Sequence, residues 1–448
     1  MINQDWAKLT PEEKRQQRFD SWLNPKDVQF VSPEAEKAYK KRVQNFIDSF
    51  NITEPDAVPV ILLVGNLPLE LAGINYHTAI YDYTKAIQAY DSFNNKYSGE
   101  LDAFFIPGMT GIPAKAFDIL NYKLYAYPGH GLAENNLGYQ FREGEYMLAD
   151  EYDALIRDPS DFWLRTYLPR IFGAFRPFKD FQPLTSIIEI PTANLMPLAD
   201  PQVRTALKAM IDAGETLAAT KEPLADFNMK AIKQGFPLEP MNGMCKAPFD
   251  VIGDTLRGTT GLMKDIYRQP AILLKAMDVI ADIMINTTLN TARDTKVLSI
   301  FFPLHKGADG WMSQKQFDTF YWPSLKKVMN ALINDGILVR LFAEGKFDTR
   351  LEKINEFPKG SVSWWFDQTD MFRAKQVLGN SCCIQGNVPS SLLMTGTPAA
   401  VKDYCRKLIE VCGRGGGFIL SPGAIVDNPK LENIRVMVEA VREYGTFR

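Results

Sequence analysis

The sequence lacks several features that would assign the chain to other classes of protein. It contains no run of about 20 apolar residues, so no membrane-spanning helix is expected. It has no basic stripe and its net charge is −3, so nucleic acid is not expected as a partner. Its five cysteines form no Cys-x-x-Cys pair and no disulfide framework spacing. Because the start MINQDWAKLT also lacks a signal-type segment, we expect a soluble protein of the cytoplasm.

Apolar and aromatic side chains are what the chain has in quantity. Of its 448 residues, 46% are hydrophobic and 12% are aromatic, which suits a large core with a lined pocket. Length alone suggests two or three domains, although α/β barrels also run long as single units.

Two polar segments near the N-terminus carry the residues that start helices. TPEEKRQQRFDSWL (10–23) and SPEAEKAYKKRVQNFIDSF (32–50) each open with Thr or Ser, then Pro and Glu. This order supplies an N-cap, a first-turn proline and early acids. It predicts an N-terminal helical extension over residues 1–57, ahead of a domain at 58–448.

From residue 58 onward, short apolar runs alternate with longer amphipathic stretches. Apolar strands separated by helices predict an α/β fold with a parallel sheet covered on both faces. The number of units predicts a closed (β/α)8 TIM barrel, with an insertion around residues 177–240. The expected strands are 58–66, 101–108, 138–147, 236–244, 297–307, 337–345, 361–368, 382–389 and 416–423.

Polar side chains follow several of these strands. In a (β/α)8 barrel, catalytic residues lie at the carboxyl ends of the strands. Glu344 ends the run LVRLFA, where a charge is costly to bury unless it is paired, and His305 ends SIFFPL. We therefore expect Glu344 and His305 to be catalytic. The substrate-binding candidates are Asp367, Gln385, Asn242 and Asn387, with an aromatic wall from Trp311, Trp364, Trp365 and Phe366.

Each of these residues also has a structural interpretation. Glu344 has Arg350 nearby in the sequence as an ion-pair partner, and His305 also suits a hydrogen bond to a loop. Asp367 fits loop capping as well as a pocket, and Asn387 fits an Asx-type turn better than binding. Metal binding by His305, Glu344 and Asp367 is not required by their spacing, so no metal site is predicted.

The C-terminal third carries the motifs of a known family. SCCIQGNVPSSLLMTGTPAAV, the turn CGRGGG, the strand GFIL and the closing helix ENIRVMVEAVREYG resemble the uroporphyrinogen decarboxylase superfamily. The stretches YQFREGEYMLADEYDALIRDP and PFDVIGDTLRG are similar to the same superfamily, so the resemblance extends over nearly the whole chain. It implies a barrel of that type and one of two chemistries, decarboxylation of porphyrinogens or methyl transfer with corrinoid proteins.

The decarboxylase branch fits the sequence poorly. Its members grip the carboxylates of their substrate with an arginine-rich motif after the first strand, where this chain has LLVGNLPLELAG. Their last strand ends in Gly-His-Gly, whereas here it ends in SPGAIVD. A substrate with many carboxylates needs several Arg or Lys side chains, and the strand ends offer Lys306.

The zinc-dependent thiol-methylating branch fits no better. Its members have His-x-Cys after the sixth strand and a further Cys after the last, and these ligands bind the zinc that activates a thiol. Here those positions hold Phe342, Glu344 and Ala424. The resemblance allows zinc, but all three ligands of that motif are missing.

The resemblance and the expected pocket together point to a corrinoid-dependent methyltransferase of the O-demethylase type, active in anaerobic metabolism. An acid with a raised pKa beside an aromatic wall suits protonation of the phenolate that leaves a methyl ether. We expect a methoxylated aromatic donor and, as acceptor, cobalt(I) of a corrinoid on a separate protein, since the chain lacks the corrinoid-binding Asp-x-His-x-x-Gly motif. No tightly bound cofactor is expected, and the sequence does not decide between a monomer and a homodimer. The alternatives are a decarboxylase of a small aromatic or pyrrolic acid and a non-catalytic barrel.

Overall fold

A parallel β-sheet of five strands, which neighbour one another in chain order, forms the centre of the molecule. The computed structural model describes residues 6–26, 28–100, 112–182, 189, 191–295 and 297–447. All residues of the last three strands are buried, which explains why the strands read as continuous apolar runs. The strands are β4 (Ser299–Leu304), β5 (Leu338–Ala343), β6 (Val362–Phe366), β7 (Cys383–Val388) and β8 (Phe418–Pro422).

Two further segments extend this sheet, one at each edge. Val60 forms a parallel bridge with Leu420 of β8, and Met244 forms a parallel bridge with Phe301 of β4. The seven parallel segments correspond to strands one and three to eight of a (β/α)8 barrel. The position of strand two lies between strands one and three in the sequence. The run expected there, 101–108, lies outside the described residues.

The run expected as a strand at 138–147 takes another form. Only Gln140–Phe141 within it is a strand, β3, and both of its residues are exposed. It belongs to a separate small sheet with β1 (Tyr125–Pro128) and β2 (Gly131–Leu132), in the order β2-β1-β3. The charged residues around β3 favour an exposed position over a place in the barrel.

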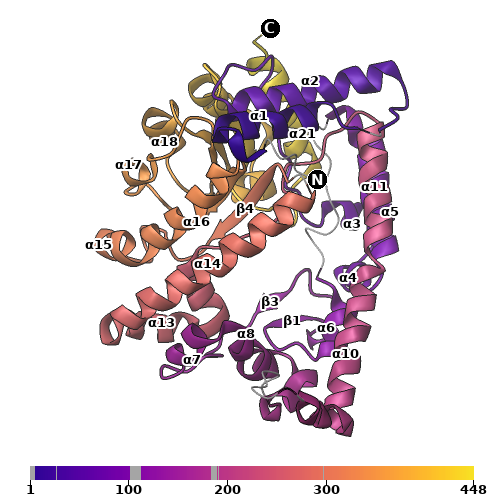
Figure 1. Cartoon of the computed structure of the whole chain (residues 1–448). Coiled ribbons are helices and arrows are strands. Elements are labelled where there is room, and N and C mark those ends of the chain that lie inside the picture. The colour runs from indigo at the N-terminus through magenta and orange to yellow at the C-terminus, as the bar shows by residue number, and fades with distance from the viewer. Residues whose placement is uncertain are drawn as a thin grey trace.

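Helices alternate with the strands and flank the sheet, as Figure 1 shows. Apolar residues of all of them except α15 (Gln314–Gln316) join those of the strands in one large core. These helices are α12 (Pro248–Asp250), α13 (Gly258–Arg268), α14 (Pro270–Thr295), α15 (Gln314–Gln316), α16 (Trp322–Asn334), α17 (Leu351–Ile354), α18 (Met371–Leu378), α19 (Ser390–Thr395), α20 (Pro398–Leu408) and α21 (Leu431–Tyr444).

The two N-terminal helices, α1 (Pro11–Leu23) and α2 (Pro33–Phe50), begin where the sequence predicts. The side chains of Thr10 and Ser32 accept hydrogen bonds from backbone amides of the first turn, which satisfies donors that have no partner inside the helix.

These helices cover the amino-terminal end of the barrel. Arg18 forms an ion pair of 2.9 Å with Asp335, which lies shortly before β5. Phe50 joins a core cluster with Leu338 and Cys383, the first residues of β5 and β7. The division of the chain at residue 57 stays a prediction.

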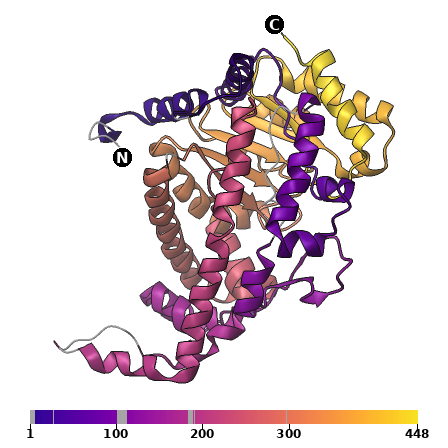
Figure 2. The ribbon, with the colours of Figure 1, turned by 90° about the vertical axis from the view of Figure 1, so that its right-hand side faces the viewer.

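The opposite side of the molecule holds a lobe that includes β1 and β3, while α10 and α11 run along one flank (Figures 1 and 2). Helices α10 and α11 fall in the region of the expected insertion. None of the described helices combines the length and apolarity needed to cross a membrane. The remaining helices are α3 (Leu67–Leu71), α4 (Tyr76–Tyr81), α5 (Tyr83–Tyr97), α6 (Ala114–Leu120), α7 (Tyr152–Arg157), α8 (Pro159–Asp161), α9 (Leu168–Ile171), α10 (Pro201–Ala218) and α11 (Lys221–Lys233).

Candidate active site

Polar residues that follow neighbouring strands lie side by side at the carboxyl edge of the sheet. The amide of Glu344 donates to the carbonyl of Leu304, and the amide of Asp367 donates to that of Ala343, each at 3.3 Å. The ends of β4, β5 and β6 are therefore level with one another. The residues named below as the rim are Lys246, His305, Glu344 and Asp367.

His305 joins two carboxylates from different elements. Its Nδ1 lies 2.6 Å from Oδ2 of Asp254, and its Nε2 lies 3.5 Å from Oε1 of Glu344. Asp254 belongs to a π-helical turn, Val251–Arg257, that follows α12. The side chains of His305 and Glu344 are 33% and 44% exposed, so a ligand can reach both. The arrangement is a carboxylate–imidazole–carboxylate relay that opens to solvent at Glu344.

Two lysines complete the surroundings of Asp254. Lys246 Nζ lies 2.6 Å from Oδ2 and Lys306 Nζ lies 2.8 Å from Oδ1. Lys306 also donates to the hydroxyl of Thr259 at 3.0 Å and lies over the ring of Trp311, 5.3 Å from its centroid. Asp254 is thereby held as a charged acceptor for the imidazole.

Burial and neighbouring charges shift the pKa values of all three groups in the relay. Burial alone would raise the pKa of Asp254, but the hydrogen bond from His305, the charge of Lys246 and the hydrogen bonds from both lysines hold it well below its usual range. Burial alone would lower the pKa of His305, but Asp254 and Glu344 raise it above its ordinary value. Burial, helped by nearby carboxylates, raises the pKa of Glu344 despite His305. His305 and Glu344 therefore hold protons more tightly than in water.

A second buried carboxylate fixes the turn that follows β4. Asp250 is fully buried, and its Oδ2 accepts from the amide of His305 at 2.9 Å and from the hydroxyl of Tyr321 at 2.8 Å. Its Oδ1 accepts from the amide of Lys306 at 3.0 Å. Burial raises the pKa of Asp250. These bonds position the backbone from which the His305 side chain projects.

An aromatic layer lies below the rim, toward the amino ends of the strands. Phe342, two residues before Glu344, stacks on Trp365, two residues before Asp367, with 3.9 Å between ring centroids and 26° between planes. Phe301 lies beside both, 6.5 Å from Phe342 and 6.3 Å from Trp365. Because residues two apart on a strand point the same way, these rings form a floor under the rim. The floor consists of Phe301, Phe342 and Trp365.

Asp367 and Asn387 hold loops at the ends of β6 and β7. Asp367 accepts from the amide of Gly345 at 3.1 Å, and the Asn387 amide group donates to the carbonyl of Thr369 at 2.8 Å. Both residues also line a cavity of about 560 Å³. Their loop-holding contacts are thus present, and their binding of substrate stays a prediction.

Gln385 pairs in register with Trp365 of the floor and lies in a buried polar network inside the barrel. Its Oε1 accepts from Arg340 at 2.8 Å, and its amide group donates to the hydroxyl of Ser421 at 3.2 Å. Arg340 is paired in turn with Glu239 at 3.0 Å. The structure therefore does not bring Gln385 together with His305 and Glu344.

Asn242 also lies apart from the rim. Its Oδ1 accepts from the amides of Leu298 and Ser299, at the amino end of β4. The sequence run was expected to end soon after Asn242, but pairing with β4 continues to Cys245, whose amide donates to a β4 carbonyl at 2.8 Å. The rim residue of this strand is therefore Lys246.

Sequence reasoning missed Lys246, Asp250 and Asp254. Both acids lie in PFDVIGDTLRG, a stretch noted only for its family resemblance. A signal was present, because two acids four residues apart in an otherwise apolar stretch share one face of a helix and need partners there.

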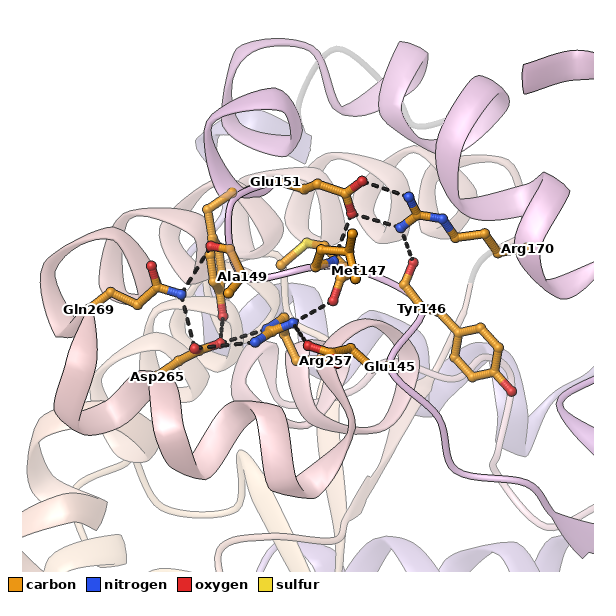
Figure 3. Close-up of polar contacts among 11 residues, drawn as sticks. Glu145, Tyr146, Met147, Ala149, Glu151, Arg170, Arg257, Asp265 and Gln269 are labelled. Atoms are coloured by element: carbon orange, nitrogen blue, oxygen red, sulfur yellow. Dashed lines mark hydrogen bonds and ion pairs between the residues drawn. The ribbon is translucent and has the colours of Figure 1, made fainter. Parts of the chain in front are cut away.

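Three residues beyond Asp254, Arg257 fastens the lobe to the same helical turn (Figure 3). Its Nε lies 2.6 Å from Oδ2 of Asp265 in α13. Its Nη1 donates to the carbonyl of Met147 at 2.5 Å and pairs with Glu145. The segment around residue 146 is thereby tied to the element that carries Asp254.

Further hydrogen bonds complete this network. Asp265 accepts from the hydroxyl of Tyr152 at 2.8 Å and from Gln269 at 2.9 Å, and Gln269 also donates to the carbonyl of Ala149 at 3.1 Å (Figure 3). The side chains of Arg257 and Asp265 are 3% and 2% exposed. The Arg257 cluster, as named below, consists of Arg257, Asp265, Glu145, Tyr152 and Gln269.

The donor set at the rim does not fit a metal ion. In the part of the chain that the structure describes, no group of three or more His, Cys, Asp or Glu side chains is arranged to hold one. Asp254 is already bound to two ammonium groups. Phe342, at the position where the resemblance to the zinc-dependent branch would imply a histidine ligand, belongs to the aromatic floor.

Comparison with known proteins places these residues in a family. The profile of the family described as uroporphyrinogen decarboxylase (URO-D) matches residues 200–444, more than half of the chain. This range contains the four rim residues and Asp254.

Curated proteins of the same name are similar to part of the chain. Uroporphyrinogen decarboxylase of Actinobacillus succinogenes is 26% identical over 209 residues, which cover 44% of this chain and 56% of that protein. The enzyme of Protochlamydia amoebophila is 29% identical over 217 residues, which cover 46% and 56%. The matches span little more than half the length of these relatives.

A solved structure extends the similarity to nearly the whole chain. A methyltransferase from Methanosarcina mazei is 16% identical and gives a TM-score of 0.55 over 89% of this chain and 98% of that chain. At this identity the likeness concerns the fold, and it confirms the expected α/β barrel of the uroporphyrinogen decarboxylase-like type. With the profile match over more than half of its length, the chain belongs to the uroporphyrinogen decarboxylase family.

Proposed function

We propose that this protein transfers a methyl group from a methoxylated aromatic compound to the cobalt(I) of a corrinoid carried by a separate protein. The observation that carries the proposal is the His305–Glu344 pair at the rim, above the stacked rings of Phe342 and Trp365. Stacked rings suit a flat aromatic ligand. The pair supplies the proton that a departing oxygen needs.

In the proposed reaction, the substrate ring lies on the floor with its ether oxygen at His305 and Glu344. The corrinoid of the partner protein supplies the nucleophile that takes the methyl group. As the C–O bond breaks, both of its electrons stay on oxygen, and a proton held by His305 or Glu344 moves to that oxygen to give the phenol. The raised pKa of both groups favours their protonated forms, which can give up this proton. Asp254 occupies Nδ1 of His305 and so directs Nε2 toward the substrate.

A decarboxylase acting on a small aromatic or pyrrolic acid is the second candidate, because the curated relatives are named uroporphyrinogen decarboxylase. The same pair of residues would protonate the carbon that loses CO₂. Large substrates with many carboxylates fit less well, because only two lysines, Lys246 and Lys306, are placed at this site among the described residues, which is few for many carboxylates.

The proposal requires partners outside the chain. A corrinoid protein would dock transiently over the rim, which needs only a modest interface, and a second methyltransferase would pass the methyl group on. The whole system would work in the cytoplasm under anaerobic conditions.

The test is an anaerobic reaction with a corrinoid protein reduced to cobalt(I). Methoxybenzoates and methylamines are added one at a time, and the demethylated products are measured by chromatography alongside the corrinoid spectrum. We expect a phenol to be released from a methoxylated aromatic. Glu344→Gln should slow this release about 100-fold, because the proton donor is lost.

The matched control is Glu410→Gln, an exposed acid after α20, which should leave the rate unchanged. Release of CO₂ without demethylation would establish the decarboxylase. No product from any donor, with a corrinoid protein shown to be competent, would overturn both the methyl transfer and its assigned residues.

A further inference from the structure

We propose that Lys246 is an anion-binding residue of the site, which takes the carboxylate of an aromatic acid. The inference rests on the proposed function and narrows its substrate class from methoxylated aromatics to methoxylated aromatic acids. It concerns the one lysine among the four rim residues, which has no role in the reaction described above.

Strand geometry turns Lys246 toward the inside of the barrel. The preceding residue, Cys245, contacts Thr288 of α14 on the outside of the sheet, with 3.9 Å between Sγ and Oγ1. Met244 pairs with Phe301 of the floor and is 69% exposed. Because side chains alternate along a strand, Lys246 follows Met244 to the inner side.

Lys246 has fewer partners than its neighbour Lys306. The ammonium of Lys306 contacts Asp254, Thr259 and the ring of Trp311, and its side chain is 9% exposed. The ammonium of Lys246 contacts Asp254, and its side chain is 25% exposed. A lysine ammonium has three N–H donors. Lys246 therefore keeps donors for a ligand that enters the barrel mouth.

The local charge favours an anion at this end of the rim. One carboxylate, Asp254, is shared by His305 and Lys246 at Oδ2, each at 2.6 Å, and by Lys306 at Oδ1. Two ammonium groups and an imidazole thus contact Asp254, and the second carboxylate of the relay, Glu344, lies at the other nitrogen of the imidazole. A carboxylate ligand would add a charge-assisted hydrogen bond to the incomplete partner set of Lys246.

The spacing along the rim fits a substituted benzoic acid. Lys246 and Glu344 follow strands on either side of β4, so their backbones lie about 10 Å apart at the usual strand spacing. A 4-methoxybenzoate laid across the floor would place its carboxylate at Lys246 and its ether oxygen at His305 and Glu344. A neutral methoxyarene would make only the second contact.

Calorimetric titration of the protein without a corrinoid partner tests this site. The ligands are 4-methoxybenzoate and the uncharged 4-methoxybenzamide, which has nearly the same shape. We expect the wild type to bind the acid at least about tenfold more tightly than the amide. Lys246→Gln should remove this preference by weakening the acid alone, whereas Lys246→Arg should retain much of it because the charge stays.

Lys402→Gln, at an exposed ion pair on α20, is the matched control and should change neither affinity. Equal affinities of the wild type for acid and amide, or an equal loss of both in Lys246→Gln, would overturn the assignment. Thermal unfolding of each variant shows whether it is folded. Tight Lys246-dependent binding of the acid without demethylation would retain the site and overturn the proposed methyl transfer. Equal demethylation of acids and neutral ethers would retain the proposed methyl transfer and overturn the carboxylate site at Lys246.

Discussion

Two groups of charged residues start three residues apart on one helical turn, yet they are built differently. Around Arg257 and Asp265, the side chains are 3% and 2% exposed, and both charged groups contact several fixed partners. Around Asp254, the same turn reaches His305 and Glu344, whose side chains are 33% and 44% exposed.

The difference separates a structural ion-pair network from a candidate active site. A buried charge is tolerated when its partners are complete, and the Arg257 cluster meets this condition within the protein. At the rim, the side chains of Lys246 and Glu344 are 25% and 44% exposed, and the pKa values of His305 and Glu344 are raised. Perturbed groups that a ligand can reach are typical of functional sites.

The largest effect is expected from breaking the buried network. Asp265→Asn removes the buried carboxylate from Arg257 and should lower the free energy of unfolding by about 3 kcal/mol, because the buried guanidinium keeps only the half-exposed Glu145 as a charged partner. Urea unfolding followed by circular dichroism measures it. The control, Asp403→Asn at an exposed ion pair on α20, should leave the unfolding midpoint unchanged. Equal midpoints for both variants would contradict a structural role for the Arg257 cluster.

Glu344→Gln should show the opposite behaviour to Asp265→Asn. Turnover should fall about 100-fold, while the unfolding midpoint stays near that of the wild type, because a partly exposed carboxyl contributes little to stability. Steady-state kinetics with a corrinoid partner and thermal unfolding of the same sample measure the two quantities. A large loss of stability in Glu344→Gln would instead make this residue part of the fold.

The sequence located one of these groups better than the other. The rule that polar residues at strand ends meet at the barrel mouth found His305, Glu344 and Asp367, because burial of the strands shows in composition. It could not find Asp254 or Arg257, because each acts from a helical turn whose orientation depends on tertiary packing. The α/β barrel was predictable for the same reason as the strand ends.

Misplaced candidates show where the strand-end rule fails. The expected strand 236–244 ended one residue before its pairing with β4 does, and the polar residue chosen near its end, Asn242, lies four residues before the rim residue Lys246. Gln385 is buried at the level of Trp365, where its polar group is satisfied by another interior residue, Arg340. Both errors concern partners that come from distant parts of the chain.

Asp254→Asn should change the titration of His305, the imidazole that Asp254 contacts at the rim. Loss of this charge should lower the pKa of His305, since the hydrogen bond and charge of Asp254 oppose the effects of burial and of Lys246. The chain has only three histidines, so selectively labelled imidazole signals can be followed by NMR against pH. His77 and His130 provide internal controls. An unchanged His305 titration would show that Asp254 does not hold the imidazole in solution.

The raised pKa of His305 should also make the free energy of unfolding depend on pH, with a smaller effect than the variants above. Because the pKa of His305 is higher in the folded state than its ordinary value of 6.5, its contribution is fully present below pH 6.5. That contribution is lost as pH rises through the folded pKa. The difference in unfolding free energy between the wild type and His305→Gln should therefore be larger at about pH 6 than at about pH 9. A difference that grows with pH would contradict the raised pKa.

The smallest effect is expected at the aromatic floor, where alternation along a strand assigns neighbouring rings to different tasks. Phe342 is partly exposed and stacks on Trp365, whereas Phe366 and Trp364 are fully buried and stack on each other in the outer core. Phe342→Leu should weaken 4-methoxybenzoate binding about threefold to tenfold, the range of one aromatic contact. Phe366→Leu should lower stability and leave affinity unchanged, because its ring faces the helices. Equal weakening of binding by both variants would contradict a direct contact between Phe342 and the ligand. It would show that both substitutions act through the packing of the barrel as a whole.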